Sequence, residues 1–139
     1  MPDRYPYINP LVKDERAKRE LVKDECARAT VAISRGQTIE ILAAGSGIPG
    51  CRIALAGHEA YVALEDYAIG DLVRYAWIGH APIHTVTAMP SGTNVMADGL
   101  GNAILHAAGA GNWICGKLDD ASSGAGGHLV RCAVKQVVA

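Results

Sequence analysis

Glycine is missing from the first 35 residues of this 139-residue chain, and phenylalanine is missing from all of it. The sixteen glycines lie between Gly36 and Gly127, whereas nearly half of the charged residues lie among the first 30. A charged stretch without glycine is typical of a solvated helix or arm, and short apolar runs between glycines are typical of a small β-rich body. The sequence therefore predicts two parts: an N-terminal arm with a charged helix, residues 1–29, and a β-rich domain, residues 30–139.

The chain also has no apolar run of about 18 residues and no excess of basic side chains. A membrane-spanning helix needs such a run, and the N-terminus lacks the apolar stretch of an export signal. The formal net charge of −1 gives no electrostatic reason to expect nucleic-acid binding. We therefore expect a soluble protein made in the cytoplasm, with neither a membrane nor nucleic acid as a partner.

Aromatic residues are scarce, at 5% of the chain, and alanine dominates its apolar half. The core must therefore be thin and built from valine, isoleucine, leucine and alanine. A thin core suggests a monomer of modest stability that depends on oligomerisation. Low surface charge would leave apolar area for a symmetric interface to cover.

The four cysteines lie far apart in the sequence, and none forms a CxxC pair. In a protein made in the cytoplasm, such residues are typically reduced thiols packed as small apolar groups. A zinc site built from cysteine and histidine is the alternative, although no pair has finger-like spacing. The residues concerned are Cys26, Cys51, Cys115 and Cys132.

The N-terminal arm begins with a proline-rich segment, residues 1–10, which predicts an extended tail because proline fixes φ and removes a donor. Strong helix formers with acid-to-base pairs at i, i+4 follow, and they predict a helix from Leu11 to about Arg28. Its apolar residues form only a narrow stripe, which is suited to docking on a partner. The candidate partner-binding residues are Tyr5, Tyr7, Leu11, Leu21 and Val22.

Eight short runs of β character follow, with turn signals every 8 to 15 residues. This spacing predicts a mainly β fold, a compact antiparallel β-barrel or sandwich. A short helix is also possible at residues 103–108, although glycines flank it. The expected strands are residues 38–42, 52–55, 61–64, 71–78, 83–87, 94–97, 113–116 and 128–134.

Two patterns could indicate chemistry. Residues 45–50 match GxGxxG, but another strand pattern follows where a dinucleotide site needs a helix, so a turn is the better interpretation. His80 and His84 are close in sequence, yet Pro82 separates them and no third ligand lies nearby. We therefore expect no catalytic residue, no cofactor and no metal ligand. The rival hypothesis is a small β-barrel enzyme or metal- or ligand-binding module that uses His80, His84 and Asp98.

Four stretches in the last two thirds of the chain resemble bacteriophage capsid decoration proteins, which are also called head cement proteins. The family pattern has an apolar-Gly-Asp-Leu-Val entry to a strand, an Ala/Gly turn, a strand that reaches a glycine, and a valine-rich terminal strand. The similarity covers roughly residues 30–138. The stretches that carry it are Tyr67–Val73, Gly92–Gly99, Ala108–Leu118 and Ala121–Cys132.

The resemblance implies a structural protein without an active site, a homotrimer with a β-rich body. It would bind the major capsid protein on the exterior of the virion, bridge neighbouring subunits and stabilise the mature head, after assembly in the host cytoplasm. Three linked arms would raise avidity when all can engage at once. A phage tail or baseplate component remains an alternative. If the division of the chain is right, deleting residues 1–28 should leave the β-rich domain folded and weaken capsid binding.

Overall fold

The computed structural model describes residues 26–43, 47–109, 111–124 and 127–138. Within these ranges the chain is all-β, and no helix there could cross a membrane. The strands are β1 (Cys26–Ala29), β2 (Thr38–Ile41), β3 (Gly50–Ile53), β4 (Tyr61–Ala63), β5 (Leu72–Ala76), β6 (Ile78–Thr85), β7 (Ala88–Met89), β8 (Asn94–Ala97), β9 (Ala103–Leu105), β10 (Trp113–Leu118), β11 (Ser122–Ser123) and β12 (His128–Val138).

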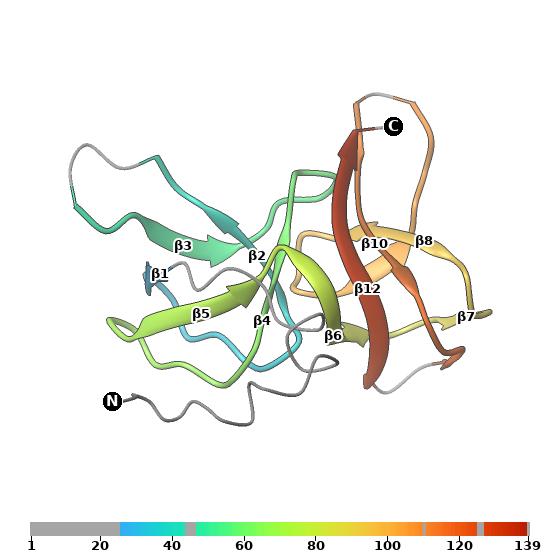
Figure 1. Cartoon of the computed structure of the whole chain (residues 1–139), viewed down its shortest axis with the longest axis horizontal. Coiled ribbons are helices and arrows are strands. Elements are labelled where there is room, and N and C mark those ends of the chain that lie inside the picture. The colour runs from blue at the N-terminus through green and yellow to red at the C-terminus, as the bar shows by residue number, and fades with distance from the viewer. Residues whose placement is uncertain (1–25, 44–46, 110, 125–126, 139) are drawn as a thin grey trace, which may run out of the picture.

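The strands form two small closed barrels that lie side by side (Figure 1). The first barrel has the ring order β1-β3-β2-β4-β5, and the second has the ring order β10-β12-β6-β9-β8. Only Trp77 separates β5 of the first barrel from β6 of the second, so the chain passes directly from one to the other. A two-stranded sheet of β7 and β11 accompanies the second barrel.

Both barrels have the same connectivity. We number the five ring strands of each barrel in chain order: β1 to β5 in the first barrel, and β6, β8, β9, β10 and β12 in the second. In each barrel the first ring strand pairs parallel with the third and antiparallel with the fifth. The second ring strand then pairs antiparallel with the third and the fourth, and the fourth with the fifth. The two barrels are therefore two copies of one structural unit.

The register of the pairings is the same in both copies. Ile39 lies opposite Ile53 and Tyr61 in the first barrel, and Val95 lies opposite Leu105 and Gly116 in the second. The tripeptide Leu-Val-Arg occurs in the fifth ring strand of each unit, at Leu72–Arg74 and at Leu129–Arg131. Its valine pairs with Ala27 in one barrel and with Ile83 in the other.

The turn before the second ring strand is also repeated. Gly36 and Gly92 have φ values of 86° and 84°, a region that glycine enters without a Cβ penalty. The N–H of Gly36 donates to the carbonyl of Ala63 at 2.8 Å, and the N–H of Gly92 donates to the carbonyl of Leu118 at 2.8 Å. The same glycine thus ties the same turn to the fourth ring strand in both units.

The core is thin, as the composition predicts. Its largest fully buried side chains include Ile39, Ile83 and Leu118. One cluster lies within the first barrel, while the other joins Ala60, Val62 and Ala76 of the first barrel to apolar residues of the second. Because that cluster is shared, the two barrels form one folded body.

The structure confirms the mainly β fold and its barrel character, but it differs from the expected single antiparallel barrel or sandwich. There are two barrels, and each contains one parallel pair. The segment considered for a helix at residues 103–108 contains strand β9, which pairs with β8 and β6. Its pairing partners thus decide its structure, against the helix propensity of alanine and leucine.

The expected arm overlaps the first barrel at its end. Cys26–Ala29 form β1, which pairs with β3 and β5, so the helix expected to reach Arg28 is wrong for these residues. Ladder pairing closes the barrel at this point and requires an extended backbone. The rest of the expected helix and the tail lie outside the described residues, as do Tyr5, Tyr7, Leu11, Leu21 and Val22.

Candidate functional site

Two adjoining hollows lie where the barrels meet, and we call them together the junction groove. The larger has a volume of about 650 Å³ and the smaller about 370 Å³. Glu59, Tyr61 and Trp113 line both hollows and form their common wall. Other lining residues are Glu40, His58 and Asn112 in the larger hollow, and Trp77, Lys135 and Gln136 in the smaller.

Two equivalent loops build the groove. Each follows the third ring strand of its barrel: residues 54–60 connect β3 to β4, and residues 106–112 connect β9 to β10. The N–H of Trp113 donates to the carbonyl of Gly57 at 2.9 Å, which fastens one loop to the strand after the other. A side chain at Gly57, where φ is 72°, would collide with the amide of Asn112, so the close approach of the two loops favours glycine there.

A second contact crosses the junction at the smaller hollow, which Gln136 lines. The N–H of Ala60 donates to Oε1 of Gln136 at 3.0 Å and fixes the orientation of that carboxamide. The ring of Tyr61 packs against Tyr75, with ring centroids 5.2 Å apart. The walls of the groove are therefore held in place by contacts within the protein.

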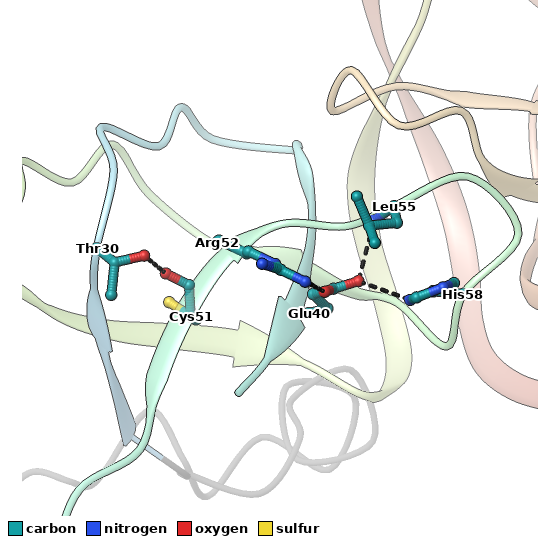
Figure 2. Close-up of polar contacts among 6 residues, drawn as sticks. All are labelled: Thr30, Glu40, Cys51, Arg52, Leu55 and His58. Atoms are coloured by element: carbon teal, nitrogen blue, oxygen red, sulfur yellow. Dashed lines mark hydrogen bonds and ion pairs between the residues drawn. The ribbon is translucent and has the colours of Figure 1, made fainter. Parts of the chain in front are cut away.

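A charged cluster borders the larger hollow (Figure 2). Oε2 of Glu40 accepts hydrogen bonds from Arg52, with Nε at 2.8 Å and the terminal guanidinium nitrogen at 2.7 Å. Oε1 accepts the N–H of Leu55 at 2.9 Å and lies 3.0 Å from Nδ1 of His58. Nearby, the hydroxyl of Thr30 donates to the carbonyl of Cys51 at 2.7 Å.

The surroundings of Glu40 favour its charged form. Its side chain is only 10% exposed, and burial by itself would raise the pKa of the carboxyl group. The N–H of Leu55, the Arg52 guanidinium and His58 outweigh that effect and leave the pKa below its usual value of 4.5. Both oxygens are engaged by neighbours, so this carboxylate joins β2, β3 and the following loop, and it is not a free base or nucleophile.

We expect Glu40→Gln to destabilise the protein at neutral pH by about 1–3 kcal/mol, because the amide cannot accept all the donors that the carboxylate accepts. The folded-state pKa lies below the unfolded value, so the contribution of the charge is complete above about pH 4.5 and is lost as the pH falls through the folded-state pKa. Urea unfolding of both proteins at pH 7 and at pH 3 measures this, and the difference should shrink at pH 3.

The matched control for that experiment is Glu59→Gln, which removes an exposed carboxylate on the loop between β3 and β4. Its free energy of unfolding should stay within about 0.5 kcal/mol of the parent. Equal losses of unfolding free energy for both variants at pH 7 would contradict the role of Glu40 in joining β2, β3 and the following loop.

The two histidines of the rival hypothesis have separate partners. Both lie on β6, where Nδ1 of His80 is 2.6 Å from Oδ2 of Asp119, and Nδ1 of His84 is 2.6 Å from Oδ1 of Asn102. Nδ2 of Asn102 donates to Oδ2 of Asp98 at 3.0 Å, so Asp98 reaches His84 only through an amide. Among the described residues no group of three histidine, cysteine or carboxylate side chains could hold a metal ion. The structure does not bring His80, His84 and Asp98 together as one site.

Three of the four cysteines are buried free thiols, as the sequence predicts. Burial raises the pKa of Cys115 to about 12 and also raises the pKa values of Cys51 and Cys132. A thiol with a raised pKa is a poor nucleophile and a poor metal ligand at neutral pH. These cysteines therefore act as small apolar core residues, while the side chain of Cys26 lies outside the described part.

Sequence reasoning missed the junction groove altogether. Its residues come from five strands, β2, β4, β6, β10 and β12, from two loops and from Trp77 between the barrels, and only the packing of the barrels brings them together. One signal was visible in the sequence: the chain has only two tryptophans, and both line the smaller hollow.

Comparison with solved structures identifies a similar fold. The N base of the head fiber gp8.5 of bacteriophage phi29 superimposes with a TM-score of 0.64, at 18% sequence identity. The match covers 83% of this chain and 95% of the other. No protein-family model and no curated protein sequence matches the chain.

Proposed function

We propose that the chain is a structural protein of a bacteriophage head, a decoration protein on the outer surface of the mature capsid. It binds the major capsid protein, bridges neighbouring subunits and stabilises the shell. The observation that carries the proposal is the shared fold with the base of a phage head fiber, which extends over nearly all of that chain. The resemblance to capsid decoration proteins in residues 30–138 supports it independently.

The surface and interior are consistent with this role. The carboxylate of Glu40 accepts hydrogen bonds from Arg52 and Leu55 and joins neighbouring strands, and the thiols of Cys51, Cys115 and Cys132 are buried. Large apolar side chains are exposed at Ile69 (71%), Leu100 (77%) and Leu105 (64%). Exposed apolar surface is typical of contact with other protein.

We further propose that three copies associate on the capsid, because the thin core and exposed apolar side chains leave area for a symmetric interface. The arm residues Tyr5, Tyr7, Leu11, Leu21 and Val22 are proposed to contact the capsid. One weak contact from each copy would give strong binding, since linked sites raise avidity by about 10²–10⁴.

Sedimentation tests this proposal. The full chain should pellet with empty mature capsids of the phage that encodes it and stay in the supernatant alone, and it should not pellet with tails. Replacing Tyr5 and Tyr7 with alanine should weaken pelleting at least tenfold, because three arms lose the same contact. The control Glu65→Gln changes an exposed polar residue of the body and should bind as the parent does.

Two results would contradict the proposal. Absence of binding to mature capsids would refute the decoration role, and binding to tails alone would point to a tail component. For the trimer, monomers at every concentration in analytical ultracentrifugation, together with isolated copies on the virion, would be decisive against it.

A further inference from the structure

We propose that the junction groove is a binding site for a neutral oligosaccharide. The inference stands apart from capsid binding, because the groove is formed by the described body of the chain and requires no partner protein. It follows from the placement of aromatic rings, the polar groups around them and the closure of both barrels.

The aromatic residues are distributed unusually. The chain has no phenylalanine and only two tryptophans, and its buried core consists mostly of alanine, valine, isoleucine and cysteine. Trp77, Trp113 and Tyr61 are each partly exposed, and all three line the smaller hollow. The described core contains one aromatic residue, Tyr75, and Tyr61 and Trp77 also pack against its cluster. Partly exposed rings gathered at a groove are typical of recognition surfaces.

The polar groups around these rings offer both donors and acceptors. Glu59 supplies acceptors, Lys135 supplies donors, and Asn112 adds an amide whose Nδ2 also donates to the carbonyl of Ala107. Sugar hydroxyl groups both donate and accept hydrogen bonds, and the C–H faces of a pyranose ring are apolar enough to cover an aromatic ring. A wall of rings edged by mixed polar groups matches both properties of a sugar.

The charges of the groove argue against an ionic ligand. Arg52 already neutralises Glu40, whereas Glu59, which lines both hollows, would repel an anion, and Lys135, which lines the smaller one, would repel a cation. A neutral ligand meets neither repulsion. This makes an uncharged glycan a better match than a phosphate, a nucleotide or an acidic polysaccharide.

An extended peptide is also disfavoured. The strands that border the groove are β2, β4, β6, β10 and β12, and each pairs with a neighbour on both sides in its closed barrel. They leave no free strand edge for a peptide to extend. The ligand must therefore be held by side chains, as an oligosaccharide would be.

The groove is large enough and already formed. The two hollows, of about 650 and 370 Å³, fall in the range of about 300–1,000 Å³ that is usual for ligand sites. Glu59, Tyr61 and Trp113 line both hollows, so the hollows adjoin and a ligand of more than one sugar ring could occupy both. Gln136 is held by the N–H of Ala60, and Tyr61 packs against Tyr75. Because these side chains are already ordered, ligand binding costs little side-chain entropy.

Tryptophan fluorescence gives a direct test, because the only two tryptophans of the chain line the groove. The full-length protein is titrated with four neutral probes: maltohexaose, cellohexaose, chitohexaose and mannohexaose. We expect a saturable change in emission with at least one probe and no saturable change with the acidic probe polygalacturonate. Calorimetry with the responding probe then gives Kd for the parent and the variants.

Trp113→Ala should weaken binding at least tenfold, because Trp113 belongs to the wall shared by both hollows. Glu59→Ala provides a second variant in case the first does not fold, and thermal unfolding monitors the fold of both. Leu100→Ala, an exposed apolar residue that does not line the groove, should bind as the parent does.

Three outcomes would overturn the proposal. They are the absence of saturable binding by all four neutral probes, undiminished binding by folded Trp113→Ala and Glu59→Ala proteins, and tighter binding of polygalacturonate than of any neutral probe. All the measurements use the isolated protein, so failure of capsid binding would leave them unaffected.

Discussion

Gly116→Val is expected to unfold the protein at room temperature or to reduce its free energy of unfolding by about 3 kcal/mol or more. Gly116 lies on β10 between Val95 and Val134. A Cβ atom at this position would lie 2.5 Å from Sγ of Cys132 and 2.9 Å from the carbonyl oxygen of Ala133. Both obstacles belong to β12, which closes the second barrel, and the carbonyl oxygen of Ala133 cannot move without shifting that strand.

Urea unfolding followed by circular dichroism measures the effect, and two further variants separate its causes. Gly92→Ala places a Cβ where no atom lies within 4 Å, so its cost is only that of a positive φ, about 1–2 kcal/mol. Combining Gly116→Ala with Cys132→Ala removes the nearest obstacle, so the double variant should be more stable than Gly116→Ala alone. Equal stability of Gly116→Val and Gly92→Ala would show that space at β10 is not limiting.

The alternation of residues along single strands was enough to predict much of the fold. In Leu72–Ala76, Val73 and Tyr75 face the core while Leu72 and Arg74 are exposed, as period-two spacing requires. Closure into two rings could not be predicted in the same way, because it depends on pairings between distant segments, such as Arg28 with Leu72 and Leu129 with His84. Local patterning carries no information about such partners.

The duplication was hidden for a related reason. Leu-Val-Arg occurs in both units, but many equivalent positions have diverged in chemistry. Glu40 and Arg52 pair across β2 and β3, and the corresponding pair across β8 and β9 is Met96 and Ile104. The backbone ladder is the same with either pair, because its hydrogen bonds join main-chain groups and do not depend on the chemistry of the side chains. The repeat is therefore visible in register and hardly visible in residue identity.

The junction groove depends on this duplication. The loops of residues 54–60 and 106–112 are equivalent segments of the two units, and they meet only because the barrels share one core cluster. Sequence alone could point to Trp77 and Trp113 as rare residues, but it could not place them at one wall. For the histidines, closeness in sequence does not mean a shared site: His80 contacts Asp119, and His84 contacts Asn102.

Deleting residues 1–28 is expected to open the first barrel and destroy its cooperative unfolding. That deletion removes most of β1, which pairs with β3 on one side and β5 on the other. Its loss would expose two strand edges and the buried side chains of Val73 and Cys51 to water. The structure thus reverses the expectation that this deletion leaves the β-rich domain folded.

The matched truncation removes residues 1–24 and leaves every described strand intact. It should unfold in one cooperative transition with native circular dichroism, whereas the protein without residues 1–28 should show a lower urea midpoint and a shallow or absent transition. The four residues between the two end points are thus expected to separate a folded protein from an unfolded first barrel. Equal stability of the two truncations would mean that β1 does not close the ring, and that β3 and β5 remain paired to the rest of the barrel without it.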